Sequence, residues 1–165
     1  NCFEEIHDFE SKTGVQFDFI FHATGTGTTQ AGLICGKLIN RWNGKIIGIS
    51  IAREKQRGRK VVLESAREYL LAQGIMFSET DLDAATIFID DYIGDGYGDA
   101  SVSVSDTINK AMTRYGISLD ETYTGKAFAG MEDYIEKKEL EDKNILFIHT
   151  GGTPLFFDWL QNKYI

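Results

Sequence analysis

The fold of this chain is decided by residues 17–32, which read FDFIFHATGTGTTQAG. Residues 17–22 are rich in aromatic and β-branched side chains, which favour a strand. They lead into a cluster of glycines and threonines, and a helical pattern begins at Gln30. A strand, a glycine turn and a helix in immediate succession are typical of a βα unit in a parallel sheet.

Three further apolar segments predict strands that join the first one in a sheet. They are residues 45–52, 86–89 and 144–149. Their nearly continuous apolar character indicates a parallel sheet that is covered on both faces.

Amphipathic segments alternate with the predicted strands. Helices are predicted in residues 2–10, from Gln30 to about Trp42, from Gln56 to Gln73, from Ser103 to Tyr115, and after Gly125. Gly74 and Gly116 are expected to end two of them. The alternation predicts right-handed βαβ units and a three-layer αβα sandwich with a mostly parallel sheet, in a single α/β domain that spans residues 1–165.

Composition narrows the possible partners. The 165 residues are 42% hydrophobic, enough for one domain with a core, and carry a net charge of −8, which disfavours a nucleic-acid partner. No apolar run approaches the ~20 residues that cross a bilayer. The first residues show no secretory signal pattern. The two cysteines, Cys2 and Cys35, make no disulfide framework, so we expect a reducing, cytoplasmic setting without a membrane partner.

Three loops follow predicted strands, where parallel sheets bind ligands. In residues 23–32, glycines allow an anion to approach the backbone, and the helix start offers free N–H groups. Threonine hydroxyls add donors, so we expect this segment to bind phosphate rather than form a plain turn. Residues 90–98 and 149–154 are glycine-containing loops that we place at the same edge.

Several other motifs favour structural roles. Residues 23–32 match neither a Walker A motif nor G-x-G-x-x-G, and no cluster has the spacing of a metal site. We expect the three histidines (His7, His22 and His149) to be structural or solvated. Asp90 and Asp91 point to opposite sides of an extended stretch, so capping or loop support is expected rather than a catalytic pair. Cys35 is expected in the core, and residues 136–143 at a solvated helix end.

Four ordered motifs resemble the C-terminal part of pyridoxal-phosphate enzymes of the tryptophan-synthase-β fold type. They are residues 23–33, residues 90–92 with 96–98, residues 123–126 and residues 145–152. Within that fold type the chain is most similar to the group of D-cysteine desulfhydrase and 1-aminocyclopropane-1-carboxylate deaminase. The resemblance implies an incomplete large domain of that fold, pyridoxal 5′-phosphate as cofactor, a small D-amino acid as substrate and a homodimer in the full-length protein.

The resemblance also implies roles for single residues. The cofactor phosphate would be held by the loop Gly25, Thr26, Gly27, Thr28 and Thr29, through backbone N–H groups and the Thr29 hydroxyl. Thr150 would reach toward the pyridine nitrogen. Tyr123 would lie against the cofactor ring or near the substrate, and Tyr97 would face the substrate; both are candidate catalytic residues. Thr28 departs from the usual glycine of the family and is expected to add a side chain at a crowded turn.

Two positions favour one branch of the family. Deaminases that open the cyclopropane ring typically carry Glu and Leu where this chain has Thr124 and Thr150. The pattern resembles D-cysteine desulfhydrase, which eliminates sulfide from D-cysteine and leaves pyruvate and ammonia. 1-Aminocyclopropane-1-carboxylate deaminase stays an alternative, as do other D-amino acids with a β leaving group.

The Schiff-base lysine of the resembled family lies in its N-terminal half, ahead of these motifs. We therefore expect the chain to be the C-terminal portion of a longer enzyme and to lack the covalent step on its own. The helical pattern that begins at Cys2 agrees with truncation. For Lys126, which follows Gly125 at a predicted helix start, we expect a solvated or capping side chain.

Two alternative functions from other protein classes stay open. The glycine loop, followed by a basic segment from Arg53 to Lys60, also fits an NADP-binding Rossmann-like oxidoreductase domain. The chain is alternatively a non-catalytic α/β module or a subunit that pairs with a separate N-terminal piece.

Overall fold

The protein is described by a computed structural model that covers residues 2–94, 96–98 and 101–164. Strands and helices alternate along the chain, as the sequence predicts. In order they are α1 (Cys2–Thr13), β1 (Phe19–Thr24), α2 (Thr28–Ile39), β2 (Lys45–Ser50), α3 (Lys55–Ala72), α4 (Glu79–Ala85), β3 (Ile87–Ile89), α5 (Val102–Tyr115), α6 (Thr124–Lys137), β4 (Ile145–Ile148) and α7 (Thr153–Tyr164).

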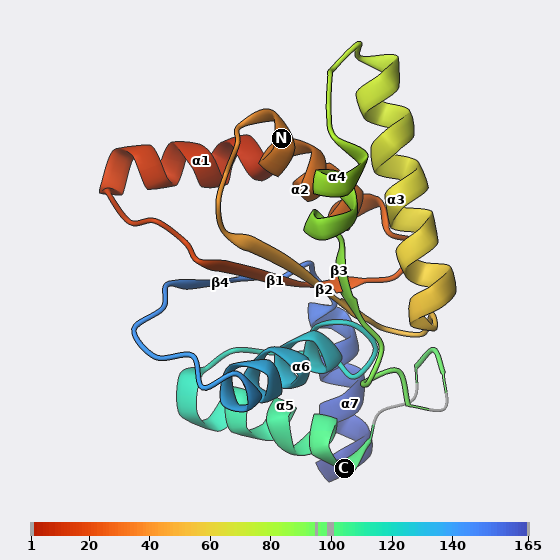
Figure 1. The fold of residues 1–165 in the computed structure, drawn as a ribbon. Helices are drawn as coiled ribbons and strands as arrows, with labels where there is room; N and C mark the ends of the chain where they lie inside the picture. The colour runs from red at the N-terminus through yellow and green to blue at the C-terminus, as the bar shows by residue number, and fades with distance from the viewer. Residues whose placement is uncertain (1, 95, 99–100, 165) are drawn as a thin grey trace.

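The described strands form one parallel sheet in the order β3-β2-β1-β4. Strand β1 is central, and Phe21 lies between Ile47 of β2 and Phe147 of β4. In Figure 1, β1, β2 and β4 run toward the right and β3 runs downward beside β2, and the loops after β2 and β3 lie on the right. This arrangement confirms the predicted parallel sheet.

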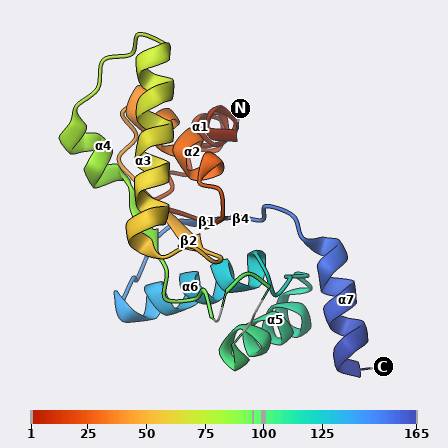
Figure 2. The ribbon, with the colours of Figure 1, turned by 90° about the vertical axis from the view of Figure 1, so that its right-hand side faces the viewer.

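Helices cover both faces of the sheet and make the predicted three-layer αβα sandwich (Figures 1 and 2). Helices α1 to α4 pack on one face around Ile20, Ile34 and Ile46. Helix α6 packs on the other face against Phe21 and Ile49. Alternation along β1 explains the division, because successive side chains of a strand point to opposite faces.

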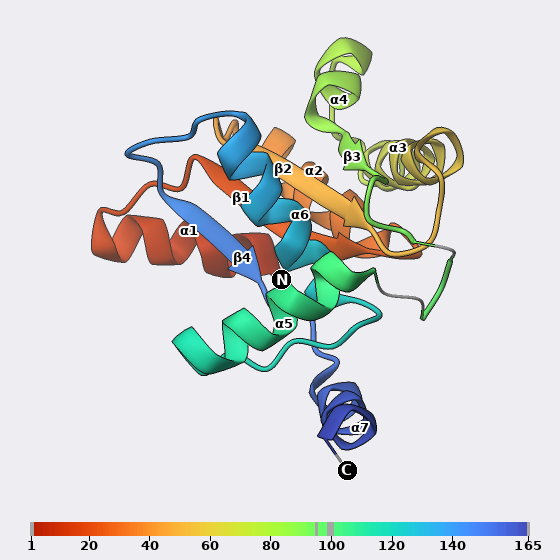
Figure 3. The same ribbon diagram turned by 90° about the horizontal axis from the view of Figure 1, so that it is seen from below.

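Helix α7 lies outside the three layers, beyond α5 (Figure 3). Its Phe156 and Trp159 are buried in a small cluster with Val104 and Ile108 of α5. The cluster attaches α7 to α5 and to Ala129 of α6, and Phe147 of β4 packs against it.

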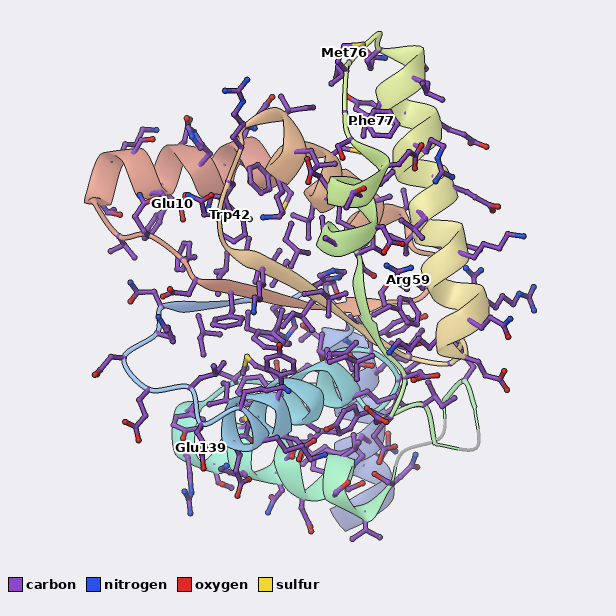
Figure 4. The ribbon with its side chains drawn as sticks, viewed as in Figure 1. Glu10, Trp42, Arg59, Met76, Phe77 and Glu139 are labelled. Carbon is purple, nitrogen blue, oxygen red and sulfur yellow. The ribbon has the colours of Figure 1, made fainter. Side chains whose placement is uncertain are left out.

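A buried carboxylate joins α1 to the turn before β2. Glu10 is 3% exposed and accepts hydrogen bonds from Trp42 Nε1, 3.1 Å from each carboxylate oxygen, and from the Phe17 N–H. Glu10 and Trp42 are labelled side by side in Figure 4. Because these donors satisfy the charge, a glutamate is tolerated on the inner face of α1.

Some boundaries differ from the sequence-based expectation. Helix α5 begins after Ser101, whose Oγ accepts a hydrogen bond from the Val104 N–H, and not at Ser103. Ser101 and Ser103 are two residues apart and are followed by similar sequences, so local sequence does not distinguish them as caps. The path of the folded chain determines that Ser101 is the cap. Helices α4 and α7 were not expected; α4 has only 7 residues and follows a Ser78 cap.

Several structural roles agree with expectation. Cys35 is buried in the core, and Asp90 supports α3 by accepting a 2.6 Å hydrogen bond from the Lys55 N–H. His22 is fully buried in β1, and the exposed His149 bonds to the Ser118 carbonyl. Within the described ranges, no helix has both the length and the apolar character that a membrane span requires.

Candidate functional site

The turn between β1 and α2 presents a helix start without a side-chain cap. Gly27 is the N-cap of α2, with a left-handed φ of 96° and no side-chain hydrogen bond. The Ala31 N–H is bonded to the Gly27 carbonyl at 2.9 Å, so the N–H groups of Thr28 and Thr29 precede the helical ladder. Together with the positive end of the helix dipole, these amides form an environment that favours an anion.

The two glycines of this turn allow the backbone to approach its neighbours closely. A Cβ at Gly25 would lie 3.2 Å from Ile51 Cδ1, and one at Gly27 would lie 3.0 Å from Val62 Cγ2. The left-handed φ of Gly27 adds strain for any side chain. The sequence therefore places glycine where the backbone itself must form the binding surface.

A tyrosine pair faces this turn across a cavity of about 250 Å³. The hydroxyls of Tyr97 and Tyr123 are hydrogen-bonded, and their rings meet edge-to-face with centroids 5.9 Å apart. The cavity is lined by Gly25, Thr26, Ile51, Ala52, Arg53, Tyr97 and Tyr123. The structure thus brings two of the predicted loop residues and both predicted tyrosines to one place.

The tyrosine pair is suited to holding a proton. The hydrogen bond with Tyr97, with a smaller contribution from burial, raises the pKa of Tyr123. The Tyr123 hydroxyl is therefore protonated at neutral pH and able to donate to a group in the cavity.

Arg53 places a cation on the cavity wall, whereas the basic segment that contains it indicates only the dinucleotide alternative. Its Nη1 donates to the Thr26 carbonyl at 3.0 Å, which holds the guanidinium against the glycine turn. The Ser50 hydroxyl also bonds to the Arg53 backbone at both its N–H and its carbonyl. The one signal for this role in the sequence is the position of Arg53 directly after a predicted strand.

Asp120 shapes the turn that carries Tyr123. This fully buried carboxylate accepts hydrogen bonds from the N–H groups of Thr122, Tyr123 and Thr124 and from the Thr124 hydroxyl, at 2.7–3.0 Å. A Cβ at Gly152 would lie 2.1 Å from Asp120 Oδ2, so the loop after β4 packs directly on this turn. Asp120 is a residue of the site that the sequence motifs did not indicate.

The remaining predicted residues lie at the same edge of the sheet but do not line the cavity. Thr28 and Thr29 are exposed in the first turn of α2, and Thr150 is exposed after β4. The exposed Thr28, whose Oγ1 lies 3.3 Å from Thr26 Oγ1, shows that the turn is not crowded at this position, contrary to expectation.

The expectation for Lys126 is wrong. Its side chain is 0% exposed, and its Nζ donates to the carbonyls of Ile51, Ile93 and Gly96. The first turn of α6 packs against the loops after β2 and β3, which removes this side chain from solvent. Its acceptors lie 30 or more residues away along the chain, so local sequence could not reveal them.

A larger cavity, of about 700 Å³, lies at the opposite edge of the sheet, between α1 and the turn before β2. The residues that line it, such as His7, Asn40 and Lys45, lie near the amino ends of the strands. Ligands of parallel sheets bind beyond the carboxyl ends of the strands, so we place the functional site at the smaller cavity.

A comparison with known families matches residues 1–151 to the family described as "Pyridoxal-phosphate dependent enzyme". The chain belongs to this family. The family match confirms pyridoxal phosphate as the cofactor and replaces the dinucleotide interpretation of the glycine loop. Arg59, from the basic segment of that interpretation, instead donates to the Thr86 and Asp83 carbonyls (Figure 4).

Individual relatives of the pyridoxal-phosphate family carry two activity names. A Pyrococcus furiosus protein with the provisional name 1-aminocyclopropane-1-carboxylate deaminase is 38% identical over 148 residues, which are 90% of this chain and 43% of that protein. A D-cysteine desulfhydrase of Yersinia enterocolitica is 34% identical over 149 residues, which are 90% of this chain and 44% of that protein.

A solved structure supports the same relationship. The crystal structure of a homologue of 1-aminocyclopropane-1-carboxylate deaminase matches with a TM-score of 0.83 and 32% identity, over 97% of this chain and 47% of that one. The chain thus spans less than half the length of these relatives. The fold is that of the tryptophan-synthase-β-like enzymes, as the sequence motifs predict.

The glycine turn fits the phosphate of this cofactor. Its uncapped helix start, its close-packed glycines and the neighbouring Arg53 guanidinium provide donors and positive charge for a dianion.

Proposed function

We propose that this chain forms the phosphate-binding and tyrosine-bearing part of an enzyme that eliminates sulfide from D-cysteine to give pyruvate and ammonia. The observation that carries the proposal is the shared cavity, in which the glycine turn and the Tyr97–Tyr123 pair face each other. We also propose that the chain is the C-terminal portion of a longer enzyme that acts as a homodimer. The two free cysteines, Cys2 and Cys35, favour a reducing, cytoplasmic setting.

In this proposal the glycine turn binds and orients the cofactor. The N–H groups of residues 25–29 and the Thr29 hydroxyl hold its phosphate, and Thr150 donates to or accepts from its ring nitrogen. A hydroxyl at this nitrogen does not enforce protonation, in contrast to a carboxylate. When bound, the cofactor supplies an electron sink for the carbanion that forms at the substrate α-carbon.

The tyrosine pair holds and transfers a proton in the cavity. Tyr123 holds a proton on its hydroxyl oxygen, and Tyr97 is positioned to pass one to or from it through their hydrogen bond. Arg53 adds a positive charge on the same wall, which favours substrates and products that carry a carboxylate.

Thr124 favours the desulfhydrase over the cyclopropane deaminase. Its hydroxyl donates to Asp120 Oδ2 at 2.7 Å and the side chain is fully buried. It is therefore bonded to the Asp120 turn that precedes α6 and supplies no acid or base to the cavity, at the position where the deaminases typically carry a glutamate.

The test uses the complete product of the gene, loaded with pyridoxal phosphate, and compares D-cysteine, L-cysteine and 1-aminocyclopropane-1-carboxylate. We expect sulfide and pyruvate from D-cysteine at a rate well above keto-acid release from the cyclopropane substrate. Tyr123→Phe should lower kcat for D-cysteine by about 100-fold, the size of a lost general acid–base group. The exposed Tyr115 of α5 provides the control, and Tyr115→Phe should retain full activity. Faster turnover of the cyclopropane substrate would assign the chain to the deaminase branch.

A further inference from the structure

Lys126 occupies a place that is unfavourable for a cation unless it is fully compensated. It lies in the first turn of α6, where the helix dipole is positive, and it is completely buried. Removing an ammonium group from water carries a large free-energy penalty in proteins, which the hydrogen bonds of Lys126 must offset.

Three backbone carbonyls within the described residues compensate this charge. Lys126 Nζ lies 2.9 Å from the Ile51 oxygen, 2.7 Å from the Ile93 oxygen and 2.9 Å from the Gly96 oxygen. An ammonium group has three N–H donors, and each of these carbonyls accepts one. A group that donates three hydrogen bonds is charged and has no lone pair, so Lys126 is not disposed to act as a nucleophile.

These carbonyls belong to two different segments of the site. Ile51 follows β2 and lines the cavity. Ile93 and Gly96 belong to the loop after β3, which we name the tyrosine loop (residues 90–94 and 96–98), because Tyr97 directly follows Gly96. Lys126 therefore joins the loop that carries Tyr97 to the cavity wall.

The tyrosine loop needs such an attachment. It has no regular helix or strand, and three of its glycines (Gly94, Gly96 and Gly98) adopt positive φ values. Glycines raise the conformational entropy of a free loop, and Tyr97 itself is 67% exposed. The other described side-chain attachments of the loop, Asp90 to the Lys55 N–H and Tyr92 to Asp133, lie at its start. The contacts of Lys126 with the Ile93 and Gly96 carbonyls are the ones next to Tyr97.

We infer that Lys126 is a positioning residue, whose ammonium group holds the tyrosine loop in the conformation that pairs Tyr97 with Tyr123. The consequence for catalysis rests on the proposed function, whereas the attachment of the loop does not. Lys126 acts through Tyr97 and does not touch the reacting atoms.

The first experiment compares Lys126→Met with Lys138→Met, a change of an exposed lysine at the end of the same helix, in the complete cofactor-loaded protein. Hydrogen exchange is followed in the peptide that contains Tyr97 and in the peptide that contains β1. We expect Lys126→Met to speed exchange near Tyr97 by about 10-fold or more and to leave β1 protected, because loop opening is local. Exchange that stays unchanged near Tyr97 would overturn the inference.

The second experiment separates positioning from general stability. If Lys126 acts through Tyr97, then Tyr97→Phe and the double variant Lys126→Met/Tyr97→Phe should have the same kcat, while each single change lowers it. Additive losses would overturn the inference. The cofactor absorbance band should persist in all three variants.

The third measurement needs no variant and covers a failure of Lys126→Met to fold. Acetic anhydride labelling of the native protein, read by mass spectrometry, should modify Lys126 about 100-fold more slowly than Lys138, because opening must precede reaction. Equal rates would overturn the inference.

If the protein bound no pyridoxal phosphate and lacked activity, while Lys126→Met still loosened the loop, the proposed function would fail and the attachment would stand.

Discussion

His22 links the stability of the protein to pH. It is fully buried in β1, and its Nδ1 bonds to the Ala23 carbonyl at 2.9 Å. Burial lowers the pKa of His22 to about 4, against the smaller opposing effect of that hydrogen bond. The unfolded chain, with an ordinary histidine pKa of about 6.5, binds this proton more readily than the folded chain.

The free energy of unfolding should therefore fall as pH decreases from about 6.5 toward 4, by an amount on the order of 3 kcal/mol from His22 alone. The stability is fully present above the unfolded pKa and is lost below it. Urea unfolding across this range measures the effect. His22→Asn, which retains a donor for the Ala23 carbonyl, should flatten the profile; an unchanged slope would show that other groups cause it.

A side chain at Gly27 should weaken cofactor binding by more than the strain of its positive φ alone explains. Gly27→Ala places a Cβ 3.0 Å from Val62 at a φ of +96°, and it should weaken pyridoxal-phosphate binding by about 10-fold, or 1.4 kcal/mol. Gly74→Ala is the matched control, because Gly74 also has a positive φ (+65°) but open space around it. Absorbance titration should show a loss only in the first variant. An equal loss in both would mean that general strain, rather than the turn, is responsible.

Among the elements, α6 depends on a cap that precedes it. The Asp120 carboxylate accepts four hydrogen bonds from the turn at Thr122, Tyr123 and Thr124. Asp120→Ala leaves these donors buried without an acceptor and should lower the free energy of unfolding by about 2–4 kcal/mol. The exposed Asp106 of α5 offers a control, and Asp106→Ala should change it by less than about 0.5 kcal/mol. Thermal denaturation of both variants measures these changes in the free energy of unfolding. Equally small losses in Asp120→Ala and Asp106→Ala would show that Asp120 does not stabilise the start of α6.

The predictability of elements followed their length and periodicity. The strands and the helices α2 and α3 have apolar patterns that local sequence reveals. Helix α4 is too short for a clear period, although Ser78 caps it. The start of α5 was misplaced because Ser101 and Ser103 are both suitable caps, and tertiary contacts of Val104 choose between them.

At the scale of the whole molecule, the described cavity lacks a lysine among its lining residues. The buried Lys126 follows Tyr123 of the cavity wall by three residues, and its ammonium group donates hydrogen bonds to three backbone carbonyls. Borohydride reduction of the complete cofactor-loaded protein should therefore attach the pyridoxyl group to a lysine outside residues 1–165. Peptide mapping by mass spectrometry checks this, and a label on Lys126 would contradict both the prediction and the role we infer for this residue.

The sequence by itself determined the alternation of strands and helices, the glycine turn at residues 25–29 and the family motifs, because each of these is written in neighbouring residues. Only the tertiary structure decided that Lys126 is buried, that Arg53 joins the cavity wall and that Asp120 holds the turn of Tyr123 against Gly152. The Lys126–Ile51 contact, for example, joins residues 75 positions apart. Burial and charge compensation at such distances depend on how helices pack on the sheet, which no local period or turn residue encodes.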